Sequence, residues 1–150
     1  MKLQDVLKSD VALPLAKRTA LNFMITNTSF SEKFLDFFKQ YDISTQQFNV
    51  LRILRGQKGK PANLATIQER MIHKNSNTTR LIDKLLVKGF VKRTICPENR
   101  RKVEIVITES GLYLLETIDP KLNELEEKAI QPLTTAEAET LNILLEKLRG

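Results

Sequence analysis

The spacing of the apolar residues changes twice between Asn63 and Thr108, and few folds accommodate that change. Asn63 precedes a short segment whose apolar residues recur every three or four positions. A second segment with this helical spacing runs from Ser76 to Lys88 and stops at Gly89, a residue type that often ends helices. After Gly89 the period falls to two, which is typical of strands. The sequence therefore predicts two short helices followed by a β-hairpin.

The hairpin has strand patterns at residues 90–96 and 103–108, which are separated by the turn-like sequence PENRR. Its tip is predicted to carry Arg100 and Arg101. A short helix, a tight turn, a second helix and a hairpin with a basic tip together make a winged helix-turn-helix.

Long helical patterns flank this segment on both sides. A stripe of apolar residues from 12 to 41 predicts a first helix of about 28 residues, or roughly 42 Å, which is too long for one small domain to cover. Ser44 begins a capping-box pattern that opens the next helix. After the hairpin, Thr108 opens a helix that Pro120 is expected to kink or interrupt, and a second capping-box pattern, Thr134 with Glu137, opens the last helix. The predicted fold is mainly α with a small β-hairpin wing, in the order α-α-α-α-β-β-α-α.

Charge is distributed unevenly along the 150 residues, whose formal net charge is +6. Residues 56–108 hold twelve Lys and Arg against four Asp and Glu, which gives this segment a net charge of +8. Residues 1–55 carry +3, and residues 109–150 carry −5. A basic middle segment with an acidic tail indicates that the predicted winged helix-turn-helix faces a polyanion.

The leading end of the second short helix has the residue types that reading a DNA duplex requires. The major groove is about 12 Å wide and admits one α-helix, whose first residues must be small and polar enough to hydrogen-bond with base edges. The hairpin can place Arg100 or Arg101 in the neighbouring minor groove, where the negative potential favours arginine. The other residues predicted to contact double-stranded DNA are Asn75, Ser76, Asn77, Thr78, Thr79 and Arg80 at the bases, with Lys84, Lys88 and Lys102 at phosphates.

The stretch NSNTTRLIDKLLVKGFVKR, followed by PENRRKVEIVITESG, resembles the core of the MarR family of bacterial transcriptional regulators. The shared features are Thr79-Arg80-Leu81 at the centre of the recognition helix, the stop from Leu85 to Gly89, and the helix start from Ile107 to Gly111. The resemblance implies that Arg101 is the wing arginine of the minor groove. Asn99 occupies the place of the acidic residue that usually holds this arginine, so it is assigned to the DNA-binding site as well.

The resemblance covers almost the whole chain and implies a homodimer on a palindromic operator. One subunit spans 1–150, with dimerisation helices at about 12–41 and 109–150 and a DNA-binding winged helix-turn-helix at about 45–108. Such proteins usually repress, and many release DNA on binding a small apolar or phenolic effector. The apolar residues that can line a cleft between the first two helices are Phe23, Phe30, Phe34, Phe48 and Leu51.

Residues suited to catalysis or metal binding are scarce. The chain has one histidine, His73, one cysteine, Cys96, and no glycine-rich phosphate loop, which argues against an enzyme, a metal centre or a bound cofactor. No apolar run reaches the roughly 18 residues of a membrane helix, and a cytoplasmic protein is expected. Two alternatives stay open: a winged helix used only for protein contacts, and a regulator that senses oxidation of Cys96.

Overall fold

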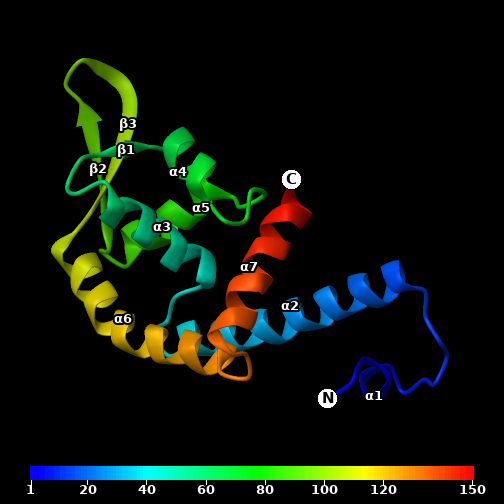
Figure 1. Cartoon of the computed structure of the whole chain (residues 1–150). Helices are drawn as coiled ribbons and strands as arrows, with labels where there is room; N and C mark the ends of the chain where they lie inside the picture. The colour runs from blue at the N-terminus through cyan, green and yellow to red at the C-terminus, as the bar shows by residue number, and fades with distance from the viewer. The chain divides into compact units, whose positions relative to one another are not determined.

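Helices dominate the computed structural model, which describes residues 1–150 (Figure 1). In chain order the elements are α1 (Leu3–Leu7), α2 (Leu15–Lys39), α3 (Thr45–Gly56), β1 (Ala62–Asn63), α4 (Leu64–Arg70), α5 (Thr78–Val87), β2 (Val91–Cys96), β3 (Asn99–Ile107), α6 (Glu109–Ile130) and α7 (Thr135–Arg149). The predicted mainly helical fold with a hairpin wing is confirmed. The elements α1 and β1 were not predicted, because they are too short to show a hydrophobic period. None of the helices combines the length and the apolar character that a membrane span requires.

Side chains predicted as caps hold the first turns of several helices. At the start of α3 the Ser44 N–H donates to Gln47 Oε1 at 2.8 Å, and the Gln47 N–H donates to Ser44 Oγ at 3.0 Å. At the start of α7, hydrogen bonds from the backbone N–H and the hydroxyl of Thr134 to the Glu137 carboxylate lower the pKa of that carboxyl. Both predicted capping boxes are confirmed.

The chain divides into two compact units, Met1–Phe48 and Asn49–Gly150. The first contains α1, α2 and the start of α3, and the buried residues of α2 are Phe37 and Phe38. In the second unit, α3, α4, α5, the sheet and α6 all contribute to the core. Its most deeply buried side chains, each at most 2% exposed, are Val50, Leu51, Leu54, Ile67, Met71, Ile82, Leu85, Val91, Ile105, Leu115 and Ile118.

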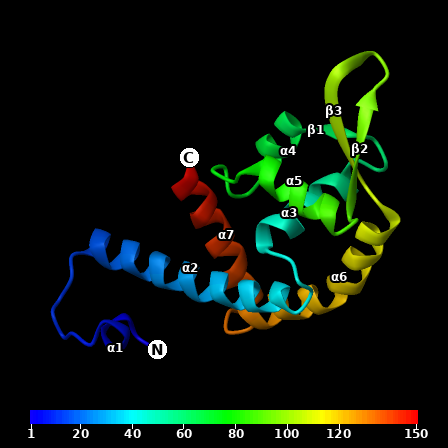
Figure 2. The same ribbon diagram turned by 180° about the vertical axis from the view of Figure 1, so that it is seen from behind.

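The sheet has the antiparallel order β1-β3-β2, and the β2–β3 hairpin projects beyond the helices of its unit (Figures 1 and 2). The predicted five-residue turn is wrong. Cys96 pairs with Asn99, so that only Pro97 and Glu98 connect the strands. Two-residue connections are the commonest in hairpins. The consecutive charged residues after Asn99 have no alternating pattern, which is why the sequence did not reveal that β3 begins there.

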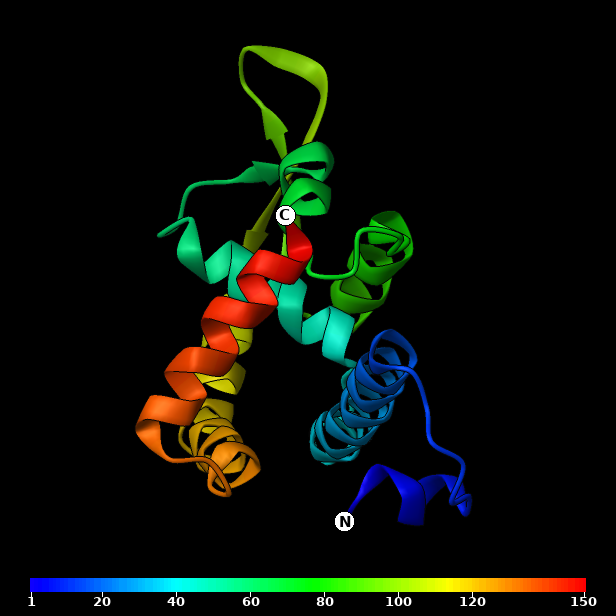
Figure 3. The ribbon, with the colours of Figure 1, turned by 45° about the vertical axis from the view of Figure 1, so that its right-hand side comes forward.

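Two helices differ from their predicted bounds. The first long helix spans 15–39 instead of 12–41. The predicted recognition helix, α5, begins at Thr78 instead of Ser76, because Asn77 is the N-cap: its Oδ1 accepts the Arg80 N–H at 3.1 Å. α6 passes through Pro120 without interruption. Figure 1 shows it bending along its length, and Figure 3 shows α7 folding back from its end.

The start of α6 approaches the end of α5 and the wing closely at Gly111. A Cβ atom at this position would lie 2.4 Å from Phe90 O and 2.7 Å from Ile107 Cγ1. We expect Gly111→Ala to destabilise the fold by about 1–3 kcal/mol, as overpacking does, although alanine is the better helix former. Gly56→Ala is the matched control, because its added Cβ has no atom within 4 Å outside its chain neighbours and the backbone of its own helix. Thermal unfolding measures both, and a Gly111→Ala protein as stable as the wild type would contradict the close approach.

Candidate nucleic-acid interface

Two amide side chains hold the turn between α4 and α5. Asn49, which is 3% exposed, accepts the Ile72 N–H at Oδ1 over 2.8 Å and so ties α3 to the turn. Gln68 Nε2 donates to Lys74 O at 2.6 Å, while Gln68 Oε1 accepts the hydroxyl of Thr78. A single side chain of α4 therefore bonds both to the turn and to the first residue of α5, which fixes where the recognition helix starts.

Most residues predicted to read bases are accessible at this leading end. The exposed ones are Asn75, Asn77, Thr79 and Arg80. Ser76 is half-buried, and its hydroxyl donates to His73 O at 2.7 Å. Asn77 uses its Oδ1 as the helix cap, so its amide N–H groups are the part that can donate to a base edge.

Thr78 does not belong with this accessible group, because the structure buries its side chain. The residue is only 6% exposed, and its hydroxyl is bonded to Gln68. Thr78, Ile82 and Leu85 are the buried residues of α5. Their spacing of four and three places them on one helix face, so the periodicity that identified the apolar face already contained Thr78.

The lysines predicted to hold phosphate lie away from the start of α5. Lys84 is exposed in the last turn, and Lys88 is the half-buried C-cap residue. Gly89 follows with a φ of +75°, the left-handed conformation expected of a helix stop. Lys102 is exposed in β3.

The basic residues of the wing lie on an irregularity in the ladder between β2 and β3. Ile95 pairs with Val103, but the next residue, Cys96, pairs with Asn99. The residues of β3 left without a partner by this shift are Arg100, Arg101 and Lys102, and all three are exposed. Such bulges redirect side chains away from a regular sheet. Asn99 Oδ1 accepts the backbone N–H of Arg101 at 3.1 Å, so Asn99 holds the main chain of the wing arginine.

An ion pair that the sequence did not predict joins the wing to the recognition helix. Arg93 Nη2 of β2 lies 2.5 Å from Asp83 Oδ1 of α5. Their side chains are about half exposed. The two residues come from different elements, and only the folded arrangement of α5 and β2 brings them together.

The sequence and the fold both match known proteins. The model of the MarR family matches residues 43–103. A MarR transcription factor from Planctomyces limnophilus, solved by crystallography, is 32% identical with a TM-score of 0.71, and the match covers 91% of this chain and 98% of that one. The chain belongs to the MarR family of transcriptional regulators.

Two other proteins similar to this MarR-family chain have informative descriptions. The transcriptional repressor IacR from Pseudomonas putida is 30% identical over 108 residues, which is 72% of this chain and 64% of that protein. A mutant MarR from Escherichia coli, solved in complex with operator DNA, is 22% identical with a TM-score of 0.76, and the match covers 99% of each chain.

The aromatic residues predicted to line an effector cleft differ in exposure in this MarR-family chain. Phe23 is 50% exposed, and the rings of Phe30 and Phe34 stack at 6.4 Å. Phe48 is half-buried and stacks on Phe38 at 4.6 Å, while Leu51 is fully buried.

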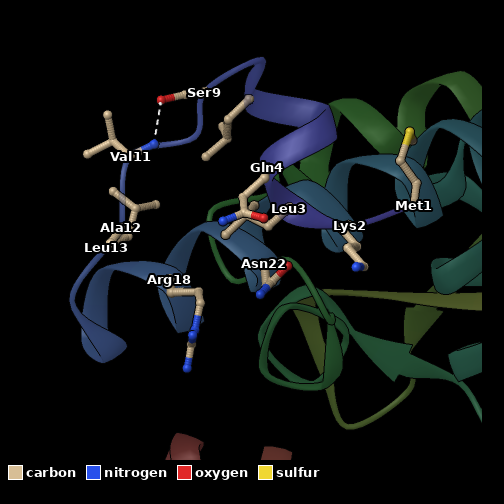
Figure 4. A pocket seen from close by; sticks show the side chains of 11 residues that line it. Met1, Lys2, Leu3, Gln4, Ser9, Val11, Ala12, Leu13, Arg18 and Asn22 are labelled. Carbon is tan, nitrogen blue, oxygen red and sulfur yellow. Dashed lines mark hydrogen bonds between the residues drawn. The ribbon is translucent and has the colours of Figure 1, made fainter.

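A pocket of about 500 Å³ lies elsewhere in the first unit, between α1, the linker after it and the start of α2 (Figure 4). Leu3, Leu7 and Leu13 line it together with Arg18 and Asn22. None of the five residues predicted for the effector cleft is among its lining residues.

The remaining reactive side chains stand apart from one another. Cys96 is a free, half-buried thiol at the end of β2. No three His, Cys, Asp or Glu side chains come together as they would around a metal ion.

Proposed function

We propose that this chain is a homodimeric repressor that binds a specific sequence of double-stranded DNA. The observation that carries the proposal is the joint exposure of the polar start of α5 and the basic bulge of the wing, in a segment of net charge +8. α5 enters the major groove and the wing lies over the adjacent minor groove. The Escherichia coli MarR mutant, which has the same fold, was solved in complex with operator DNA, and this supports the choice of DNA as the partner.

The exposed side chains divide into two roles in this proposal. The residues that contact base edges are Asn75, Ser76, Asn77, Thr79 and Arg80. Lys84, Lys88 and Lys102 hold phosphates, which positions the protein without reading sequence. Thr78 has an indirect role in this proposal. The hydrogen bond from its hydroxyl to Gln68 holds the start of α5 in place.

A homodimer follows from the apolar surface that the two terminal regions leave exposed. In α7, Leu141, Leu144 and Leu148 are 44%, 56% and 69% exposed. In α2, Leu15 is 69% exposed. Exposed apolar side chains of this kind are typical of an interface, and a two-fold dimer makes the DNA site a palindrome.

Repression is the form of regulation we propose, because a dimer bound across an operator blocks access to that DNA. The similarity to the repressor IacR supports this choice. The competing function is protein binding alone, without specific DNA binding. A winged helix with that function would not need an exposed basic wing.

The deciding experiment is selection from randomised duplex DNA, followed by titration at several salt concentrations. We expect an enriched palindrome whose half-site centres are one helical turn apart, roughly 34–36 Å, and whose binding weakens steeply with salt. Recovery of no enriched sequence, with equally weak binding to every duplex, would favour the protein-contact function.

We also propose that a small apolar or phenolic effector releases the DNA by binding near Phe23, Phe30 and Phe34. The half-exposed ring of Phe23 and the stacked pair of Phe30 and Phe34 offer an aromatic surface for such a ligand. Screening a panel of phenolic compounds for release of the selected palindrome tests this. A compound that releases the wild type should fail to release Phe23→Ala, and equal release of both proteins would exclude Phe23 from the site.

The wing gives a prediction that separates two neighbouring arginines. We expect Arg101→Ala to weaken operator binding more than Arg100→Ala, because the family pattern assigns Arg101 to the minor groove. Asn99→Asp should leave binding intact or improve it, since aspartate keeps the acceptor for the Arg101 N–H and adds a charge that can pair with the guanidinium. Titration of the selected palindrome measures all three. Equal losses for the two arginines would indicate phosphate contacts without insertion into the groove.

A further inference from the structure

α6 is joined to the winged helix-turn-helix at its first turn. The Thr108 N–H donates to Phe90 O at 3.0 Å, and the Thr108 hydroxyl donates to Gly89 O at 2.7 Å. Gly111, one turn further on, lies so close to Phe90 that a Cβ atom has no room. These contacts connect the start of α6 to the residues that directly follow α5. These hydrogen bonds hold only the first turn of α6.

A second polar contact, between Arg55 and Asp119, lies further along α6. Arg55, in the last turn of α3, donates from Nη1 to Asp119 Oδ2 at 2.6 Å and from Nη2 to Asp119 Oδ1 at 3.3 Å. The two side chains are 35% and 38% exposed. A two-point contact between guanidinium and carboxylate fixes orientation as well as distance. Because Asp119 lies about 16 Å along the helix from Thr108, the two contacts together define the direction of α6.

The ion pair is next to the proline of α6. Pro120 directly follows Asp119, and a proline inside a helix removes one backbone hydrogen bond and permits a bend. Ile118 and Leu122, on either side, are buried and hold the same stretch against the core. The position of Asp119 therefore affects the direction of the second half of α6, which begins at Pro120.

We infer that the Arg55–Asp119 pair sets the half-site spacing of the operator by fixing the angle between α6 and the winged helix-turn-helix. The inference rests on the proposed dimer, in which α6 leads from the DNA-binding part into the dimerisation region. With half-site centres roughly 34–36 Å apart, each recognition helix lies about 17 Å from the two-fold axis. A rotation of about 10° then moves it by about 3 Å, close to one base-pair step. Arg55 and Asp119 are positioning residues and do not contact bases.

The test compares affinity for the selected palindrome with affinity for palindromes in which one base pair is added or removed between the half-sites. The wild type should prefer its own spacing. In Asp119→Asn this preference should fall at least about fivefold, because α6 loses the two-point contact that fixes its orientation relative to α3. Affinity for a single half-site should not change. The double variant Arg55→Asp with Asp119→Arg reverses the pair and should restore the preference.

Glu124→Gln is the matched control. It removes the exposed pair between Glu124 and Lys128, whose charged atoms lie 2.6 Å apart on the same helix, and it should keep the wild-type preference. A folded Asp119→Asn protein with unchanged spacing preference overturns the inference. So does an equal loss of affinity on every duplex, which indicates a role in folding alone. If Asp119→Asn does not fold, Arg55→Lys, which keeps the charge but loses the two-point contact, gives the same comparison. A wild type that selects no spaced palindrome overturns the proposed function instead.

Discussion

Arg80→Ala should lose operator preference while keeping most of its affinity for random DNA. Arg80 is exposed in the first turn of α5, and its backbone N–H is held by the Asn77 cap, so the start of its side chain is fixed. Arginine forms two parallel hydrogen bonds with guanine in the major groove. Losing them should cost about 1–3 kcal/mol at one position of the site, or roughly 5- to 150-fold in affinity. Titrating the operator, its single-base variants and a random duplex measures this loss.

Lys84→Ala is the matched control for that experiment, because Lys84 is exposed on the same helix one turn further on. A lysine at a phosphate adds affinity for every sequence alike. We therefore expect Lys84→Ala to weaken all duplexes equally and to reduce the slope of log affinity against log salt by about one. If Arg80→Ala binds operator and random DNA as the wild type does, the assignment of Arg80 to base reading is wrong.

The parts of the fold that were predictable are those that local sequence determines. Ser44 with Gln47 and Thr134 with Glu137 cap their helices through contacts three residues apart, so the sequence alone contains both partners. Gly89 stops α5 for the same reason, since only the local backbone conformation is involved. The order of helices and strands follows from hydrophobic periods, which are local as well.

The parts that were missed depend on contacts between distant segments. Arg55 meets Asp119 across 64 residues, and no local pattern indicates that pairing. Asp83 and Arg93 are closer in sequence, yet their contact depends on how the wing packs against α5. Thr78 differs from these ion pairs, because its position on the same helix face as Ile82 and Leu85 could be predicted from the spacing of the three residues. Polar residues at the start of a helix suggest contact with DNA bases. For Thr78 this interpretation was given more weight than the hydrophobic period, which predicts a buried residue.

Replacing Leu144 and Leu148 with glutamate should convert the proposed dimer into a monomer. Both side chains are more than half exposed in the single chain, and α7 has no buried residue at all. Fully burying a leucine contributes about 1.5–3 kcal/mol, and a two-fold interface contains every substituted position twice. Glutamates in a buried interface would also lack partners for their charges. Sedimentation at micromolar concentration should report a dimer for the wild type and a monomer for this variant.

The control for that experiment is Val87→Glu, since Val87 is 89% exposed but lies outside the predicted dimerisation regions. It should sediment as the wild type does.

The acidic C-terminal region supports its assignment to the dimer interface, because a segment of charge −5 is favoured at the end of the dimer that lies away from the DNA phosphates. On DNA, the monomeric variant should bind a single half-site and lose the advantage that a palindrome offers, since only a joined pair of recognition helices engages both half-sites at once. A wild type that is a folded monomer, and that binds one half-site as tightly as a palindrome, would contradict the dimer.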